Sequence, residues 1–202
     1  MEDEKPGEPQ SSVTRSSLRD FILDLISVKN EGDSLAFSCT LLLSLLYNLS
    51  GTRSVNAHPV NQSGASSKEV SDIDILDSTT NRIISCFEVK DKNFTYTDVS
   101  HSVNKSLKSD IQNLTFIYSP DTFTGNHVEI TNKLSSVFPT FDLILVNVPH
   151  FIESIILLLP CVSLEEIKLS INKCLTEMRP KQDTTVRIKL LFKKHLDVST
   201  PF

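Results

Sequence analysis

The stretch that decides the fold is SDIDILDSTTNRIISCFEVKDK, residues 71–92. Polar and apolar residues alternate along 72–76, which is the period of a β-strand. The segment 77–81 that follows consists of Asp, Ser, Thr, Thr and Asn, residues that favour turns. A second run of strand type, RIISCFEVK, occupies 82–90. These signals together predict a β-hairpin.

The two predicted strands bring charged residues together at one edge of a sheet. Alternation places Glu88 and Lys90 on one face of the second strand and leaves the intervening apolar residues for the core. Asp72 and Asp74 project from one face of the first strand. Because the turn is short, a carboxylate of the first strand comes close to Glu88 and Lys90. We therefore expect two acids and one amine to converge there.

Two carboxylates and one amine suggest a definite chemistry. Carboxylate oxygens suit Mg²⁺, which takes the rest of its ligands from water and phosphate. The metal polarises a phosphoryl group and supplies a water or hydroxide nucleophile, and an ammonium group orients that water or stabilises charge on phosphorus. The set therefore suggests phosphodiester hydrolysis. Taken alone, however, a cross-strand Asp/Lys pair on a solvated face needs no function, and that simpler interpretation is favoured.

Segments on both sides of the hairpin add further elements. Apolar residues recur at helical spacing in six segments, and two short apolar runs are of strand type. The predicted helices cover 16–27, 35–49, 97–110, 126–138, 151–159 and 164–178, and the predicted strands cover 114–118 and 141–148. Because the strand at 141–148 is almost entirely apolar, we expect it to be buried on both faces. The helix at 35–49 is apolar nearly all round, so we expect it to be central. Residues 186–195 fit either a helix or a strand.

Strands separated by helices predict an α/β fold, with a mixed β-sheet that contains the hairpin and is flanked by helices on both faces. We divide the chain into a disordered tail at 1–13, a core at 14–178 and a basic segment at 179–202 packed on the core. The whole chain has 202 residues and a net charge of −5. This charge excludes a uniformly basic coat for nucleic acid and leaves a local basic cleft possible.

The cysteines and the hydropathy point to a reducing, aqueous environment. No CxxC pair occurs, so a zinc site is not indicated. Cys39, Cys86 and Cys174 lie in apolar runs and are predicted to be buried thiols. The apolar runs are far shorter than the ~20 residues of a membrane span, and the acidic N-terminus does not have the pattern of a signal peptide. We expect a cytoplasmic protein without a membrane partner.

The hairpin and its flanks resemble the core of the PD-(D/E)xK nucleases, and more closely the SacI-type restriction endonucleases. The residues that carry the resemblance are the Gly/Ser-rich loop at 63–68, the acidic strand at 72–75, the EVKDK run at 88–92 and the segment FTYTDVSHSV at 94–103. Ser71 stands where the superfamily pattern has proline. The chain is also shorter than expected of an enzyme that both cuts DNA and recognises a specific site. The question of whether a recognition segment lies outside this chain therefore stays open.

This resemblance implies a restriction-endonuclease-like core and a role for each motif residue. Asp72 and Glu88 would bind Mg²⁺, with the backbone carbonyl of Val89 as a further ligand, and Lys90 would serve the nucleophilic water. Asp74, on the same face as Asp72, is the reserve acid. The implied activity is Mg²⁺-dependent hydrolysis of double-stranded DNA at a specific site. The implied partners are a second copy of the chain, as a homodimer, and a cognate DNA methyltransferase.

Candidate DNA-binding residues flank the motif. On the predicted helix at 97–110 the polar and basic residues lie off its apolar stripe, and more candidates lie in the loops around the hairpin. They are Ser66, Ser67, Lys68, Lys92, His101, Lys105 and Lys108. A solvated face, and for the loop a flexible linker, are the simpler interpretations. The alternative to a restriction enzyme is a nuclease-like DNA-binding or repair protein of the same fold without restriction activity.

Overall fold

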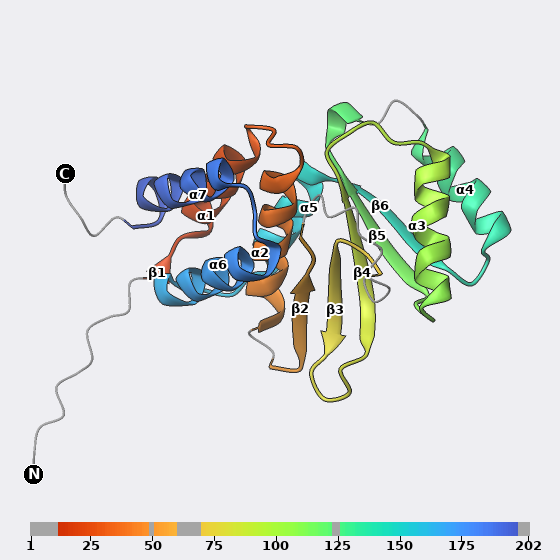
Figure 1. Cartoon of the computed structure of the whole chain (residues 1–202), viewed down its shortest axis with the longest axis horizontal. Helices are drawn as coiled ribbons and strands as arrows, with labels where there is room; N and C mark the ends of the chain where they lie inside the picture. The colour runs from red at the N-terminus through yellow and green to blue at the C-terminus, as the bar shows by residue number, and fades with distance from the viewer. Residues whose placement is uncertain (1–11, 49–50, 60–69, 123–125, 198–202) are drawn as a thin grey trace, which may run out of the picture.

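The computed structural model describes residues 12–48, 51–59, 70–122 and 126–197 (Figure 1). These parts of the chain form both helices and strands, as the sequence predicts. The first half contains β1 (Ser12–Val13), α1 (Arg15–Ile26), α2 (Asp33–Asn48), β2 (Arg53–Ala57), β3 (Ile73–Asp77), β4 (Ile83–Lys90) and α3 (Tyr96–Lys108). The second half contains β5 (Asn113–Tyr118), a short 3-10 turn, α4 (His127–Val137), β6 (Asp142–Asn147), α5 (Val148–Leu158), β7 (Val162–Ser163), α6 (Leu164–Met178) and α7 (Gln182–His195).

The central sheet has five strands in the order β2-β3-β4-β5-β6. The strands β2, β3 and β4 are antiparallel neighbours, and β4, β5 and β6 run parallel to one another. The predicted hairpin is confirmed as β3 and β4, in which Ile73 lies opposite Phe87. Asp77 ends β3, and its carboxylate accepts hydrogen bonds from the backbone N–H groups of Thr79 and Thr80, which shapes the turn.

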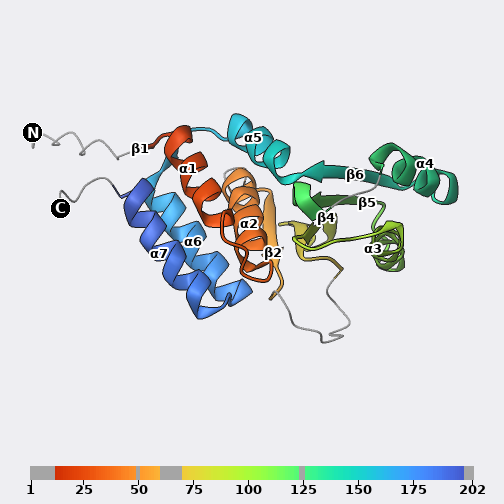
Figure 2. The same cartoon turned by 90° about the horizontal axis from the view of Figure 1, so that it is seen from above.

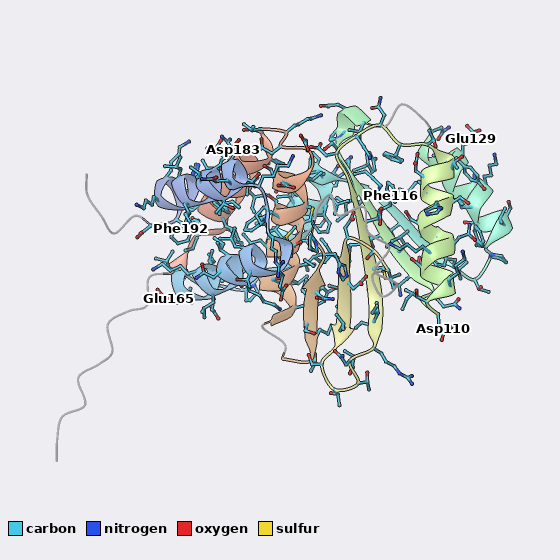
Figure 3. The ribbon with its side chains drawn as sticks, in the orientation of Figure 1. Asp110, Phe116, Glu129, Glu165, Asp183 and Phe192 are labelled. Atoms are coloured by element: carbon cyan, nitrogen blue, oxygen red, sulfur yellow. The ribbon has the colours of Figure 1, made fainter. Side chains whose placement is uncertain are left out.

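Helices cover both faces of this sheet, and each face has its own hydrophobic cluster. The helices α1, α2, α5, α6 and α7 form one large cluster with the sheet residues Ile73, Ile75, Phe87 and Ile117. The helices α3 and α4 form a smaller cluster on the opposite face (Figures 1 and 2). There Phe116 of β5 lies between the sheet and α3, with its ring centroid 4.8 Å from that of Phe94 (Figure 3). The chain is therefore a mixed α/β fold with a restriction-endonuclease-like core.

Helix α2 is central because it is apolar nearly all round. Its residues Leu41, Leu42 and Leu43 are at most 1% exposed, which agrees with the prediction of a central helix at 35–49. Gly32 precedes the helix with φ +91°, a conformation that favours glycine. This turn brings α2 back under the ends of β3 and β4, and it is one side of the site described below.

The expectation that the strand at 141–148 is buried on both faces is wrong. The corresponding strand, β6, is the last of the sheet and pairs only with β5 among the described strands. Its residues are half-buried or exposed, and Ile144 is 51% exposed. The sequence shows that the side chains of the strand are apolar. Whether they are buried depends on whether the strand has a neighbour on each side, which only the tertiary structure shows.

Both ends of the described chain pack against the helical side. Ser12 and Val13, which we expected in a disordered tail, form β1 and pair with β7; residues 1–11 lie outside the described part. The segment at 186–195, left open as helix or strand, is helical and belongs to α7, which packs on α1. Cys39, Cys86 and Cys174 are buried thiols, as predicted. No helix among the described residues is long and apolar enough to cross a membrane.

Candidate active site at the ends of β3 and β4

Asp72 and Glu88 are neighbours across the hairpin. Ile73 pairs with Phe87, so the antiparallel register places Asp72, one residue before β3, opposite Glu88. One carboxylate oxygen of Asp72 accepts a hydrogen bond of 2.8 Å from the backbone N–H of Val89. On its other side the backbone carbonyl of Asp72 accepts a hydrogen bond from the N–H of His58, which follows β2. Asp72 is therefore held from both neighbouring strands.

Lys90 completes the predicted trio. Its Nζ lies 2.5 Å from Oε1 of Glu88, and the two side chains are only 22% and 13% exposed. Burial disfavours the charged form of Lys90, but the attraction and the hydrogen bond of Glu88 outweigh this effect and raise the lysine pKa. Lys90 is thus an ammonium ion at neutral pH. In this state it can donate hydrogen bonds and stabilise negative charge, but it cannot accept a proton.

The carboxyl group of Asp72 is strongly perturbed. Burial and the nearby charge of Glu88 raise its pKa to about 6, against the opposing effects of the Val89 N–H and of Lys90 and Lys105. The carboxylates of Asp72 and Glu88 therefore lie close together, and the nearby lysines do not fully offset their negative charge. A perturbed carboxyl group of this kind is typical of a functional site, and a bound cation would relieve the repulsion.

Asp74, the reserve acid, is committed to a structural network. It is 1% exposed, and its carboxylate accepts hydrogen bonds from Ser71 Oγ at 2.7 Å and from Cys86 Sγ at 3.4 Å. Nε2 of His58 lies 2.9 Å from its other oxygen. Ser71 Oγ also accepts the N–H of Phe87. Because its oxygens already have these partners, Asp74 fixes the strands beneath Asp72 and is a poor candidate for a metal ligand.

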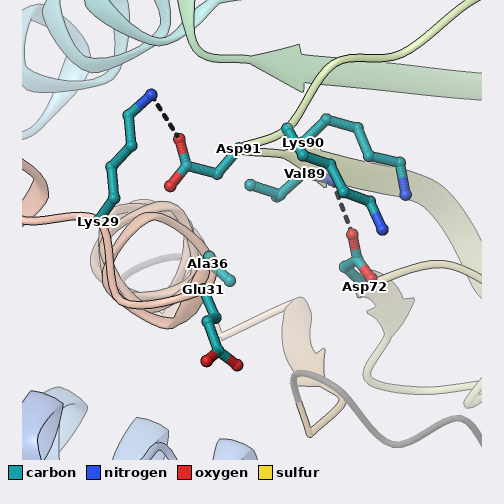
Figure 4. Close-up of a pocket in the computed structure, with 9 residues that line it drawn as sticks. Lys29, Glu31, Ala36, Asp72, Val89, Lys90 and Asp91 are labelled. Carbon is teal, nitrogen blue, oxygen red and sulfur yellow. Dashed lines mark hydrogen bonds and ion pairs between the residues drawn. The ribbon is translucent and has the colours of Figure 1, made fainter. Parts of the chain in front are cut away.

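A cavity of about 390 Å³ opens beside the trio, between the start of α2 and the ends of β3 and β4 (Figure 4). Three lysines and three acids contribute to its lining. The lining residues are Lys29, Glu31, Gly32, Ala36, Asp72, Val89, Lys90, Asp91 and Lys92. The cavity thus joins Asp72 and Lys90 to an entrance of mixed charge.

Two of these lining residues, Lys29 and Asp91, were missed by sequence reasoning. Asp91 follows the EVK run and was part of the resemblance, but no role was attached to it. It accepts a hydrogen bond of 2.6 Å from Ser119 Oγ, and Lys29 Nζ lies 4.0 Å from the same carboxylate oxygen. Lys29 also lies 3.6 Å from Asp121. No local pattern could have linked residue 29 to the hairpin, because the link exists only through the placement of α2.

The predicted DNA-binding residues fall into three groups. Lys92 lines the cavity, and Lys105 of α3 acts electrostatically on Asp72. His101 and Lys108 are exposed on α3, one on either side of Lys105 along the helix. The remaining candidates, in the loop 66–68, lie outside the described residues, so their positions are not placed relative to the site.

The basic C-terminal segment is largely paired with the chain itself. Lys194 and His195 of α7 each lie 2.7 Å from Oδ2 of Asp24 on α1. Lys181 is paired with Glu31, and Arg187 donates to the carbonyl of Asp24. These contacts hold α7 on the core and neutralise much of its positive charge. The basic residues of this segment therefore serve mainly to pack it on the rest of the chain.

The donor set at the trio is small but suited to a hard cation. Among the described residues no group of three or more His, Cys, Asp or Glu side chains is arranged to hold a metal ion. Asp72 and Glu88 supply two carboxylates, and the backbone N–H of Val89 holds one oxygen of Asp72. Mg²⁺ is commonly held by one or two carboxylates and completes its shell with water and phosphate, so this set fits it.

A five-stranded mixed sheet, flanked by helices and carrying an acid opposite a Glu-x-Lys run, defines the class of restriction-endonuclease-like proteins. Residues 10–120 match the family model of the SacI restriction endonuclease C-terminal domain. The match covers more than half of the chain and includes β3, β4 and α3, so the chain belongs to this family. Membership implies a nuclease-type hydrolase. No curated protein matches the chain significantly.

Proposed function

We propose that this chain is a Mg²⁺-dependent type II restriction endonuclease, which hydrolyses phosphodiester bonds at a specific site in double-stranded DNA. The observation that carries the proposal is the geometry of the trio. Asp72 lies opposite Glu88 in the hairpin, and Lys90 contacts Glu88. Asp72 and Lys90 line a cavity that two further lysines, Lys29 and Lys92, also line. This is the arrangement that the PD-(D/E)xK pattern requires.

Each residue of the trio has a separate task in this proposal. Asp72 and Glu88 would hold Mg²⁺, with the carbonyl of Val89 as a third protein ligand. When bound, the metal would polarise the phosphoryl group of the DNA and activate a water molecule. Lys90, which is protonated, orients the attacking water and stabilises the charge that builds up on the phosphoryl oxygens. The N–H of Val89 keeps the Asp72 carboxylate in position.

The basic residues near the trio define a path for the DNA backbone. Lys29 and Lys92 line the cavity, and Lys105 lies on α3 close enough to affect Asp72. Contacts of this kind position a duplex without reading its sequence. His101 and Lys108 extend the same helix face, and Ser66, Ser67 and Lys68 remain predicted contacts. A palindromic target, a homodimer, a cognate methyltransferase and a cytoplasmic location belong to the same proposal.

One observation favours a second candidate function. Lys90 and Glu88 already neutralise each other at 2.5 Å, and a closed pair of this kind is also what a structural salt bridge would show. A nuclease-like DNA-binding or repair protein without restriction activity would keep the same fold and the same basic path. The two candidates differ in whether Glu88 and Lys90 matter for cutting or only for stability.

A cleavage assay separates the candidates. The purified chain is incubated with unmethylated phage DNA in Mg²⁺ or in EDTA, beside the variants Glu88→Gln and Lys90→Gln. Lys189→Gln, an exposed lysine of α7, is the matched control. We expect discrete Mg²⁺-dependent fragments from the native chain and the control, and none from the two site variants. Folded native protein that binds DNA but cuts no tested DNA would support the second candidate instead.

A further inference from the structure

Strand β6 has the composition of an interior strand but the position of an edge strand. Its sequence is DLILVN, with apolar side chains on both faces, yet it pairs with β5 alone among the described strands. Ile144 is 51% exposed, and the other apolar residues of the strand are only half-buried. Figure 2 shows no described strand or helix lying along its outer side.

Backbone groups of β6 on that outer side have no strand partner in the described part of the chain. The N–H of Asp142 donates to the carbonyl of Gln112, at the start of β5, so it points inward. In a parallel pair the N–H and C=O of one residue point to the same side, and the sides alternate along the strand. Leu143, Leu145 and Asn147 therefore direct their backbone N–H and C=O groups away from β5.

The two edges of the sheet are treated differently. The opposite edge strand, β2, is covered by α6, and Nζ of Lys173 donates to the carbonyl of Val55 at 3.1 Å. Strand β6 has few of the usual protections of a free edge: it contains no lysine, no proline and no irregularity in its register with β5, and its one charged residue, Asp142, lies at its start. An unprotected edge of this kind is a template for pairing with another strand.

We propose that β6 is the dimer interface of this protein, and that it pairs antiparallel with β6 of a second copy about a two-fold axis at Ile144. In this register the outward-facing backbone groups of Leu143 pair with those of Leu145 in the other copy. A strand paired antiparallel with its own copy closes by two-fold symmetry, so no further free edge remains. The only charged residue of the strand, Asp142, lies at one end, so the two Asp142 side chains are separated. The central positions bring apolar residues against apolar residues.

Exposed apolar residues also lie on the helices that precede and follow β6. Val137, 56% exposed, ends α4 just before the turn that leads into β6. Leu157 and Leu158 are 71% and 66% exposed at the end of α5, the helix that follows β6. A strand pair alone buries little area, and a stable dimer needs more. A second copy that also covered part of these helix ends would bury additional apolar area.

Sedimentation analysis of the whole chain without DNA tests the interface. We expect the native chain to be dimeric at micromolar concentration, and Ile144→Lys, which places a charge on the exposed face of the edge strand, to be monomeric with unchanged circular dichroism. Leu190→Lys is the matched control, because Leu190 is 64% exposed on α7, far from β6. A monomeric native chain, or a dimer that survives Ile144→Lys, would overturn the proposal.

Disulfide trapping checks the same geometry without a disruptive charge. The background variant Cys161→Ser removes the only exposed thiol of the described residues. Ile144→Cys in this background should give a covalent dimer on mild oxidation, because paired positions near the axis bring their Cα atoms within disulfide range. Leu190→Cys should not cross-link. Equal cross-linking of both variants would contradict the assigned surface. The dimer belongs to the proposed function, on which this inference rests, but neither test involves cleavage, so a failure of the interface is distinguishable from a failure of the nuclease activity.

Discussion

The carboxylate of Asp72 accepts a hydrogen bond from the backbone N–H of Val89, the residue between Glu88 and Lys90. This bond ties the acid of β3 to the strand that carries the other two members of the trio. It also holds two carboxylates side by side although their charges repel, and burial and this repulsion raise the pKa of Asp72 to about 6. The two carboxylates therefore repel each other, and a bound cation would reduce this repulsion.

The first prediction concerns the stability of Asp72→Asn. The folded-state pKa of Asp72 lies above its ordinary value of 3.8, so its stabilising contribution is complete below pH 4 and is lost as the pH rises through about 6. Asparagine keeps the acceptor for Val89 and removes the charge. We expect the variant to be more stable than the native chain by about 1–3 kcal/mol at pH 8 and equal at pH 4.

Urea unfolding in EDTA at both pH values measures this difference. The exposed residue Asp20 of α1 provides the control Asp20→Asn, which should show no comparable gain at pH 8. A gain for Asp72→Asn of the same size at pH 4 and pH 8 would show that the charge of Asp72 is not the cause.

The second prediction concerns Mg²⁺ itself. A ligand that binds only the folded chain stabilises it, by about 1.4 kcal/mol at ten times its Kd. We expect Mg²⁺ to raise the melting temperature of the native chain at pH 8 and to leave Asp72→Asn and Glu88→Gln unchanged. Thermal unfolding over a Mg²⁺ titration provides the measurement, with K⁺ at matched ionic strength as the control. A rise of equal size in all three proteins would argue against a site at the trio.

The third prediction distinguishes Asp74 from Asp72. Asp74→Ala leaves His58, Ser71 and Cys86 without their buried acceptor, and breaking a buried pair costs about 3–5 kcal/mol. We expect a lower urea midpoint at pH 7 for this variant, in contrast to the stabilised Asp72→Asn. Asp77→Ala, at the exposed turn, is the comparison and should cost less. A stable Asp74→Ala protein that loses Mg²⁺ binding would instead assign Asp74 to the metal.

The fourth prediction concerns the path of the DNA. Lys29→Gln and Lys92→Gln remove cavity lysines, and each lost phosphate contact should reduce the slope of log affinity against log salt by about 0.9. Fluorescence anisotropy with a duplex in EDTA, over a salt series, measures the slope. Lys189→Gln on α7 should leave it unchanged. Equal slopes for all four proteins would place the DNA elsewhere.

Local sequence patterns were sufficient for the hairpin and its trio. Alternation over 72–76 and 82–90, with turn residues between, is a short-range signal, because the side-chain period of a strand is set by the backbone. The same signal placed Asp72, Glu88 and Lys90 on one face, and the register of β3 and β4 confirms that Asp72 lies opposite Glu88. The apolar residues all round the helix at 35–49 likewise predicted that α2 is central.

Other features depend on contacts between residues far apart in the sequence. Alternation alone places Asp72 and Asp74 on the same face of the first strand, and the family resemblance favours Asp72 as the metal ligand. The packing of His58, Ser71 and Cys86 around Asp74 gives a physical reason for this choice, which the sequence does not contain. Lys29 reaches the cavity because α2 packs under the ends of the strands.

The hairpin, most of the helices and the chemical identity of the trio could be predicted from the sequence, because they depend on residue type and on spacing along one strand or helix. The tertiary structure alone decided which acid faces the cavity, which lysines line it and that β6 is an edge strand. These follow from burial and from the order of strands in the sheet, and both are set by long-range packing that no local pattern contains.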